Sequence, residues 1–354
     1  MAITDALPSL ADEVRGLFPA RRGYLNSATC GLPPLAALAD LERVLGEWRD
    51  GLGGPDEWDP PVQECRALFG RLVGAPPEHV AVGSQTAAMA GVVAASLPPG
   101  STVLVAEEDF TSLTWPFLAQ AERGITVRAV PLEGLLEAVD DAVDWVAVSA
   151  AQSASGRLVD LAGLRAAAAR HGARVLLDAT QAAGWLPLRA ADYDIVVASG
   201  YKWLLNPRGT CFTALRPDVL ALLRPALANW YAGEDVPRSY YGPPLRLATD
   251  ARRLDLSPAW FCWAGAVAGL RLLADLGVER VFAHDVGLAD DLLARLGLPP
   301  TGSAIVSVAA SDAQRARLGA AGIAVAGRAG RVRLSFHLYN DAADVEAAAG
   351  CLAP

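Results

Sequence analysis

Lysine is almost absent from this sequence. Of its 30 lysine and arginine residues, 29 are arginine and one is lysine, Lys202. An arginine guanidinium stays protonated and does not readily form an imine, whereas a lysine amine does so. A composition that favours arginine this strongly would keep a lysine where its amine is chemically required. Chance survival of Lys202 is the alternative, and the surrounding residues decide between the two.

Patterns typical of metal sites and disulfides are also missing. The five cysteines, at positions 30, 65, 211, 262 and 351, form no CxxC pair, and the four histidines have no metal-ligand spacing against them. Both observations argue against a bound metal ion. We expect buried free thiols and no metal site.

Positive charge and long apolar runs are scarce as well. The formal net charge is −9 and there is no basic tract, which argues against nucleic acid or an anionic membrane as a partner. The longest nearly uninterrupted apolar stretches, residues 87–97 and 258–270, are shorter than the roughly 20 residues that span a bilayer. The N-terminus shows no basic residue before an apolar block and no cleavage-like signal. We therefore expect a cytoplasmic protein whose partner is a small molecule.

What the sequence does contain is an alternation of short apolar runs with alanine- and leucine-rich segments. This pattern is typical of an α/β fold in which helices cover both faces of a mostly parallel sheet. Helices are expected at residues 86–97 and 161–171, the second ended by Gly172. The seven expected strands are residues 79–82, 102–106, 126–130, 145–149, 174–178, 194–198 and 210–215. The sequence thus predicts a large domain with a mostly parallel seven-stranded sheet.

The character of the chain changes after about residue 217. Residues 229–249 are rich in Pro, Gly, Tyr and Trp, which predicts a long, ordered, functional loop, and a helix is expected to begin near Pro258. Strands at 304–308 and 331–336, with helices between and after them, predict a smaller C-terminal α/β domain. The expected division is an N-terminal segment of the small domain at 1–24, the large domain at 25–279 and the small domain at 280–354.

Two consecutive expected strands lead to an acid and an amine. Asp178 ends the strand 174–178, and Lys202 follows the strand 194–198. Because neighbouring strand ends open into one cleft, the two groups should meet there. A pyridine ring held by the lysine as a Schiff base needs a carboxylate at its nitrogen, since the protonated ring is the electron sink that stabilises a substrate carbanion. We therefore predict pyridoxal phosphate as the cofactor and Lys202 and Asp178 as catalytic residues, with a helix N-cap as the alternative role of Asp178.

Further polar and aromatic residues lie where the rest of this cofactor would be bound. Residues 83–86, Gly-Ser-Gln-Thr, follow a strand and open a helix, which makes their N–H groups and hydroxyls a natural anion site. Phe110 is placed to stack on the pyridine ring, with a core position as the alternative, and Gln181 is placed to bond the ring hydroxyl. The cofactor-binding residues predicted at this stage are Ser84, Gln85, Thr86, Phe110, Asp178, Gln181, Ser199, Tyr201 and Lys202.

Five stretches in register resemble the class V aminotransferases of the fold-type I pyridoxal phosphate superfamily. They are Tyr-Leu-Asn-Ser-Ala at 24–28, Gly-Ser-Gln-Thr-Ala at 83–87, Leu-Asp-Ala-Thr-Gln at 177–181, Ser-Gly-Tyr-Lys-Trp at 199–203 and Arg-Leu-Ser-Phe-His-Leu-Tyr-Asn at 333–340. The resemblance implies the fold-type I architecture, and that Arg333 binds the substrate carboxylate. A surface salt bridge is the alternative role of Arg333. Tyr201 departs from the family pattern, in which a histidine is common.

The resemblance also implies a homodimer whose active sites are shared between the subunits. Residues 253–258 resemble a family segment that reaches the neighbouring subunit's phosphate, although the segment is one residue shorter here, and Ser257 is predicted as a cofactor contact on this basis. Trp230 is predicted to line the substrate pocket, with interface packing as the alternative. Asn26 and Ser153 complete the predicted substrate-binding residues.

The reaction is less constrained, because the cofactor motifs are common to several chemistries. Cysteine desulfurases of this family carry a nucleophilic cysteine shortly before the Arg333 motif, and residues 319–331 contain none. The surroundings of Lys202 are more similar to isopenicillin N epimerase-like proteins and ergothioneine sulfoxide lyases. The leading hypothesis is a β-eliminating lyase that cleaves a C–S bond of a cysteine-derived amino acid. The alternatives are a class V aminotransferase, an amino-acid epimerase and a catalytically silent cofactor-binding protein.

Overall fold

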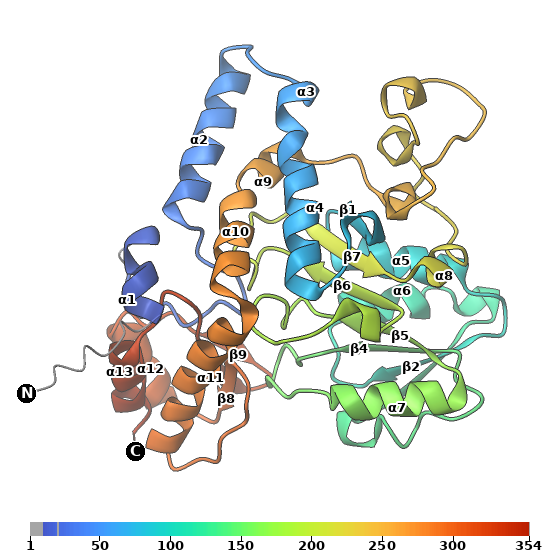
Figure 1. The fold of residues 1–354 in the computed structure, drawn as a ribbon. Helices are drawn as coiled ribbons and strands as arrows, with labels where there is room; N and C mark the ends of the chain where they lie inside the picture. Colours follow the sequence, from blue (N-terminus) through green and yellow to red (C-terminus); the bar gives the residue numbers. More distant parts are fainter. Residues whose placement is uncertain (1–9, 20, 354) are drawn as a thin grey trace, which may run out of the picture.

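The computed structural model describes residues 10–19 and 21–353. A large sheet lies at the centre of the molecule, and a small sheet with three helices lies at one end of it (Figure 1). Two further helices, α2 (Leu35–Arg49) and α4 (Pro60–Val73), stand away from the small sheet. The predicted α/β class, with a large and a small sheet, is therefore confirmed.

The large sheet contains seven strands in the order β1-β7-β6-β5-β4-β2-β3. Strands β2 to β6 run parallel, and β7 is antiparallel to both of its neighbours. Each strand lies within one residue of its predicted bounds. The strands are β1 (Val80–Gly83), β2 (Thr102–Ala106), β3 (Thr126–Val130), β4 (Trp145–Ser149), β5 (Arg174–Asp178), β6 (Ile195–Ser199) and β7 (Cys211–Leu215).

Both faces of the large sheet are covered by helices. Successive strand residues point to opposite faces, so Leu176 belongs to one buried cluster and its neighbour Leu177 to the other. The first cluster is covered by α5 (Thr86–Ser96) and α6 (Thr111–Leu118). The second is covered by α4, α7 (Leu161–His171) and α10 (Val267–Leu276). Burial on both faces explains why these strands are continuous apolar runs in the sequence.

The boundaries of α7 follow from its end residues. The side chain of Asp160 accepts hydrogen bonds from the backbone N–H groups of Ala162 and Gly163 at the start of the helix. Gly172 ends it with a φ of 71°, in the left-handed region that glycine adopts without a steric cost. This is the end that the sequence predicted.

The small sheet has the order β8-β10-β9, with both pairs antiparallel. Its strands are β8 (Ile305–Val308), β9 (Ala326–Arg328) and β10 (Arg331–Ser335), and its helices are α11 (Val278–Arg295), α12 (Asp312–Ala320) and α13 (Ala342–Leu352). Strand β9 was not expected, because it has three residues and two of them are exposed. The proposed division at residues 279 and 280 falls near the start of α11 and stays a prediction.

The segment before α2 lies against the small sheet. Tyr24 and Asn26 form parallel bridges with Ala324 and Ser335, and Leu25 packs into the buried cluster of the small sheet. Part of the segment predicted for the small domain, residues 1–9 and 20, lies outside the described residues. Its described part includes α1 (Leu10–Val14).

The remaining helices are short. They are α3 (Pro55–Trp58), α8 (Pro217–Leu220) and α9 (Trp260–Ala264), the last being the helix expected near Pro258. The predicted loop at 229–249 contains two 3₁₀ turns and a bridge between Gly233 and Leu247. Within the described ranges, no single helix has the length and apolar character needed to cross a bilayer. The cytoplasmic location stays a prediction.

The cysteines are free thiols, but they are not all buried. Cys65 and Cys211 are buried, Cys262 and Cys351 are partly exposed, and Cys30 is exposed. The expectation of buried thiols is therefore wrong for Cys30, which lies directly after the turn at residues 27–29 and in no strand or helix.

Candidate active site

A cavity of about 480 Å³ opens where β4, β5 and β6 end. Ser149, Asp178 and Ser199 are the last residues of these strands, and all three line the cavity. In α/β sheets, ligands bind beyond the carboxyl ends of parallel strands. The predicted site residues that line this cavity are Ser84, Gln85, Thr86, Phe110, Ser153, Asp178, Gln181, Ser199, Tyr201, Lys202 and Arg333.

Lys202 reaches this cavity from the turn after β6. Its Nζ lies 5.6 Å from the ring centre of Phe110 and 5.5 Å from that of Tyr201. The residue is only 6% exposed, and this burial lowers the pKa of Lys202 to about 8, against the opposing charge of Asp178. A useful fraction of the amine is therefore neutral near neutral pH, and the neutral amine is the nucleophilic form.

Asp178 lies on the strand next to that of Lys202. β5 and β6 are parallel neighbours, with Asp178 paired to Val197. One carboxylate oxygen accepts a hydrogen bond from the backbone N–H of Thr180 at 2.8 Å. The residues after Asp178 form turns rather than a helix, so the alternative role as a helix N-cap does not apply.

The environment of this carboxylate fits a cationic ligand. Asp178 is buried, which raises its pKa, and the bonds from Thr180 and the charge of Lys202 act in the opposite direction. It forms no ion pair with a residue that the structure describes. A buried carboxylate without a cationic partner is costly, and the protonated nitrogen of a pyridine ring would supply one.

A cluster of three hydroxyl groups lies at the start of α5. The Oγ1 of Thr86 lies 3.0 Å from the Oγ1 of Thr180 and 2.9 Å from the Oγ of Ser199. The Thr86 N–H donates to the same Ser199 oxygen at 3.1 Å. Gln85, before the first helical residue, makes no side-chain cap. The positive end of α5 and these hydroxyls together suit a phosphate group.

Gln181 connects the two sides of the cavity. Its Nε2 donates to the Ala28 carbonyl and to the Ser153 hydroxyl, each at 3.0 Å, and its Oε1 accepts from the indole N–H of Trp203 at 2.8 Å. Three partners thus fix the orientation of the amide. Its predicted contact with a ring hydroxyl stays a prediction.

Arg333 extends from β10 into the opposite wall. It is 1% exposed; its Nη1 donates to the carbonyl and hydroxyl of Ser153, and its Nη2 donates to the Thr29 hydroxyl at 2.7 Å. Its Nε is buried without an acceptor, and burial lowers the pKa of Arg333 to about 10. No surface salt bridge of Arg333 occurs within the described ranges. A buried guanidinium with an unused donor fits a substrate carboxylate.

Comparison with known proteins identifies the family of this chain. The family model described as aminotransferase class V matches residues 58–325. The chain belongs to the class V aminotransferase family. One structural neighbour is a C-DES mutant with glycine covalently linked to its pyridoxal phosphate cofactor. This class V chain is a pyridoxal phosphate-dependent enzyme.

Its relatives have several different activities. An uncharacterised aminotransferase of Bacillus subtilis, YcbU, is 25% identical, with 94% of each chain covered. An isopenicillin N epimerase of Amycolatopsis lactamdurans is 26% identical over 58% of this chain and 57% of its own. A solved complex of the cystine C–S lyase C-DES with cysteine persulfide has a TM-score of 0.84 and 20% identity, covering 94% of this chain and 97% of the other. The last similarity concerns the fold alone.

Three predicted residues of the class V enzyme do not line the cavity described here. The buried Oδ1 of Asn26 has no hydrogen-bond partner among the described residues. Trp230 packs against Tyr231, Tyr240 and Trp260, with ring centres 5.2 to 6.4 Å apart. Ser257 lies one residue after Leu256, whose N–H donates to the carbonyl of Val82 in β1. The roles assigned to these three residues stay predictions.

Eight lining residues were missed from the sequence: Ala28, Thr29, Ser112, Ser149, Thr180, Arg208, Gly209 and Arg328. The Cζ of Arg208 lies 4.6 Å from the ring centre of Tyr201. Its place six residues after Lys202 is a signal that could have identified it. Arg328 ends the unexpected strand β9, so no local pattern pointed to it.

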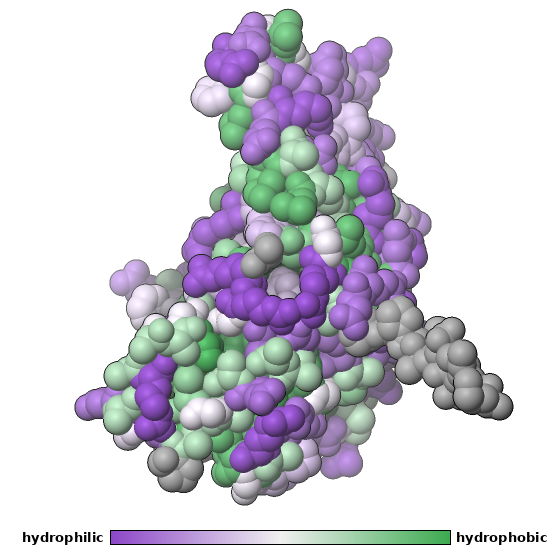
Figure 2. Space-filling model, turned by 90° about the vertical axis from the view of Figure 1, so that its left-hand side faces the viewer, coloured by the Kyte–Doolittle hydropathy of each residue, from purple (hydrophilic) through white to green (hydrophobic). Residues whose placement is uncertain are grey.

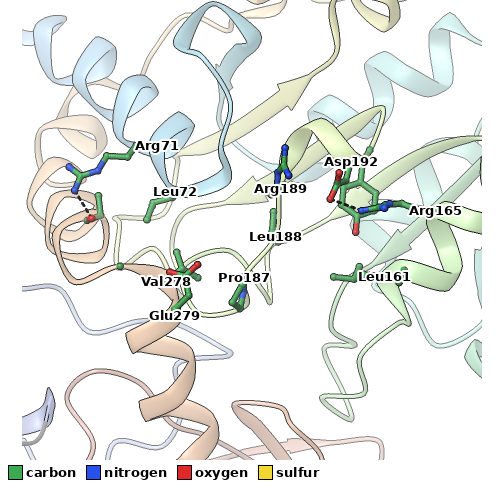
Figure 3. Close-up of a pocket in the computed structure, with 14 residues that line it drawn as sticks. Arg71, Leu72, Leu161, Arg165, Pro187, Leu188, Arg189, Asp192, Val278 and Glu279 are labelled. Atoms are coloured by element: carbon green, nitrogen blue, oxygen red, sulfur yellow. Dashed lines mark hydrogen bonds and ion pairs between the residues drawn. The ribbon is translucent and has the colours of Figure 1, made fainter.

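A second cavity, of about 560 Å³, lies away from these residues (Figure 3). It is lined by residues of α7, the segment 187–193 and the junction of α10 and α11. Arg165 pairs there with Asp192 at 2.8 Å, and Arg71 donates to the carbonyl of Ala274. It contains no predicted site residue and has largely matched charges. In the described part of the chain, no group of three or more His, Cys, Asp or Glu side chains could hold a metal ion.

Proposed function

We propose that this class V enzyme is a lyase that eliminates a β-substituent, by C–S bond cleavage, from a cysteine-derived amino acid. The observation that carries the proposal is the composition of the cavity wall. Lys202 and Asp178 are its only Lys, His, Cys, Asp or Glu side chains among the described residues. A single amine base suffices for elimination, whereas a desulfurase of this family uses a nucleophilic cysteine.

The proposal assigns a role to Lys202, Asp178 and Arg333. Bound pyridoxal phosphate would supply an electron sink for negative charge on the α-carbon of the substrate. Lys202 would hold the cofactor and, once released, move the proton at that carbon. Asp178 would stabilise positive charge at the ring nitrogen, and Arg333 would bind the substrate carboxylate and orient the α-carbon.

The cofactor's remaining groups are assigned to the large-sheet side. Thr86 and Ser199, with Ser84, Gln85 and Tyr201, would bind the phosphate through hydroxyls and the α5 terminus. Gln181 would contact the ring oxygen, and Phe110 would cover the ring face. The half-exposed Phe110 ring, near the Lys202 amine, is available for that contact.

The alternatives differ in what the chain must supply. An epimerase acting from both faces of the α-carbon needs a second acid or base. Beside Lys202 and Asp178, the ionisable described residues lining the cavity are arginines and Tyr201, whose burial raises its pKa. Transamination uses one amine base, as elimination does, so it is the second candidate. The relative YcbU is named an aminotransferase, which supports transamination.

We also propose a homodimer with shared active sites. The surface carries exposed hydrophobic side chains, visible on the face that includes the projecting end of the molecule (Figure 2). On α2 and just after it, Trp48 and Leu52 are each 61% exposed, and Tyr241 in the 229–249 loop is 90% exposed. These side chains are available to pack against a second subunit. Sedimentation equilibrium would test the dimer, and a monomeric holoenzyme would contradict it.

The reaction is tested by incubating the holoenzyme with a panel of amino acids and S-substituted cysteines. Pyruvate and ammonia are expected from the S-substituted cysteines. A keto acid with an aminated cofactor would reject elimination and support transamination, and inversion at the α-carbon would support epimerisation. A cofactor absorbance band that no amino acid perturbs would support the catalytically silent alternative.

A further inference from the structure

We propose that Arg328 is a second anion-binding position of the active-site cavity, and that the substrate carries a second acidic group, such as a carboxylate, on its side chain. This inference rests on the proposed function, because it narrows the substrate class of the same cavity. A neutral S-substituent would leave Arg328 without an anionic partner.

Positive charge exceeds negative charge around the cavity. Four basic residues line it, Lys202, Arg208, Arg328 and Arg333, against the single carboxylate of Asp178. None of the three arginines forms an ion pair with a carboxylate of the described chain. Guanidinium groups gathered in a cleft concentrate anions there and bind carboxylates through paired hydrogen bonds.

Two of the three arginines already have a place in the proposed chemistry. One guanidinium can bind one carboxylate through two parallel hydrogen bonds, and Arg333 is fixed for this by Ser153 and Thr29. Arg208 stacks on the ring of Tyr201, on the side assigned to the phosphate. Arg328 remains without an assigned anion.

The register of the small sheet places Arg328 close to Arg333. Arg333 pairs with Ala326, and Arg331 pairs with Arg328. Residues two apart on a strand point to the same face, so Arg328 and Arg333 share a face of the small sheet. Such diagonal neighbours lie about 7–8 Å apart at their backbones. Arginine side chains that start from such neighbouring positions can reach two carboxylates joined by a short thioether chain.

A two-residue turn follows Arg328 and joins β9 to β10. The two residues between β9 and β10, Ala329 and Gly330, have φ values of 46° and 75°. Positive φ at both central residues is typical of a type I′ hairpin, and a left-handed alanine costs roughly 1–2 kcal/mol. The backbone of Arg328 is therefore held by its pairing with Arg331.

The side chain of Arg328 keeps donors available for a ligand. Its Nη1 donates to the neighbouring Gly327 carbonyl at 2.7 Å, and it bonds no other described side chain. Burial is the larger cause of the lowered pKa of Arg333, and the positive charge of Arg328 lowers that pKa further. Like charges on one face of a sheet repel each other. A ligand with two acidic groups would neutralise both guanidiniums at once.

Two probes of the same shape test this position. S-carboxymethyl-L-cysteine and S-carbamoylmethyl-L-cysteine differ in one charge, and the change of the cofactor spectrum gives the Kd of each for the holoenzyme. We expect the wild-type protein to bind the acid about tenfold or more tightly, the size expected for a charge-assisted hydrogen bond. In Arg328→Gln this preference falls to about twofold or less, with the affinity for the carbamoyl compound unchanged.

Two variants make the result specific. Arg331→Gln removes the arginine that pairs directly with Arg328 but does not line the cavity, and it should keep the preference, because the Arg331 guanidinium bonds Ser307 instead. Arg333→Gln should weaken both compounds alike. Equal affinities in the wild-type protein, equal weakening of both compounds in Arg328→Gln, or a loss of pyridoxal phosphate affinity in that variant would overturn the second anion-binding position.

Pyruvate measured in the same samples separates this inference from the proposed reaction. Spectral discrimination between the probes without pyruvate would reject the lyase and leave the second anion-binding position standing. Pyruvate from both probes without discrimination would reject that position and leave the lyase standing. If neither probe changes the spectrum, both proposals are rejected.

Discussion

At the scale of single residues, the backbone around Lys202 is packed too closely at Gly31 to accept a larger side chain. Gly31 donates its N–H to the carbonyl of Tyr201 at 3.0 Å, and a Cβ at Gly31 would collide with the carbonyl oxygen of Lys202. The collision is with backbone, so the Lys202 turn itself would have to shift. A displacement of about 1 Å in a catalytic group can cost a factor of about 100 in rate.

We predict that Gly31→Ala weakens pyridoxal phosphate binding at least about tenfold, because the Lys202 amine moves from its position. Titration of the apoprotein, followed by the cofactor absorbance, measures the change. Gly46→Ala is the control, since no atom lies within 4 Å of a Cβ there. That change should stabilise α2 by about 1 kcal/mol or less. Unaltered cofactor affinity in Gly31→Ala would contradict the prediction.

The protonation of Lys202 gives a second prediction. Burial lowers the pKa of Lys202 from the usual range of a lysine amine to about 8. Only the neutral amine attacks the cofactor aldehyde, so attachment of pyridoxal phosphate to the apoprotein should accelerate about tenfold per pH unit below pH 8 and level off above it. Stopped-flow absorbance across this range measures the midpoint. A midpoint near 10.5 would show that burial does not control the amine.

The chemistry of the site was predictable where it follows from strand ends. Asp178 and Ser199 are the last residues of the buried strands β5 and β6. Because these two strands are parallel neighbours, their ends lie side by side. Arg333 was recognised by resemblance and lies in the cavity wall, although its role stays a proposal. Arg208 lies six residues after Lys202, a local signal that could have identified it, whereas Arg328 depends on contacts between distant segments, which no local pattern contains.

At the scale of elements, the segment 253–258 is held to α4 by a buried ion pair and to β1 by a hydrogen bond. Nη2 of Arg66 in α4 lies 2.6 Å from Oδ2 of Asp255, and both side chains are buried. The other oxygen of Asp255 accepts from the Val82 N–H at 2.8 Å. The segment that the resemblance directs toward a partner subunit is thus fixed from within its own chain.

We predict that Asp255→Ala lowers the free energy of unfolding by about 3–5 kcal/mol, because it leaves Arg66 buried and unpaired. Urea denaturation measures this change. Asp275→Ala removes an exposed partner of Arg71 and should cost less than about 1 kcal/mol. Similar losses in the two variants would contradict the importance of burial.

Elements also mark the limit of prediction from sequence. The seven strands of the large sheet were predictable because strands buried on both faces are continuous apolar runs. Strand β9 was not, since Gly327 and Arg328 are exposed and its pairing with β10 alone makes it a strand. The 229–249 loop was recognised by composition, but no periodicity predicted the packing of Trp230 on Trp260.

At the scale of the whole molecule, one buried histidine connects the two sheets. Nδ1 of His337 lies 2.7 Å from Oδ2 of Asp285 in α11, and Nε2 lies 3.0 Å from the carbonyl of Trp203. Both side chains of the pair are fully buried. The segment after β10 is thereby joined to the turn that carries Lys202.

We predict that His337→Ala destabilises the protein by about 3–5 kcal/mol, since the Asp285 carboxylate loses its partner in the interior. Chemical denaturation measures the loss, and His171→Ala serves as control, because its partner Asp141 is exposed. The control should change stability by about 1 kcal/mol or less. A loss no larger than that of the control would contradict the prediction.

The pairing of Tyr24 and Asn26 with Ala324 and Ser335 has a consequence for how the chain acquires activity as it is made. Thr29 and Arg333, which meet across the cavity, are separated by 304 positions in the sequence. A ribosome delivers residues in order at about 5–20 per second, so the early segment waits many seconds for its partner strand. The large sheet can form during that interval, but the wall that holds Arg333 cannot. A nascent chain therefore has its lysine in place well before it has a complete substrate site.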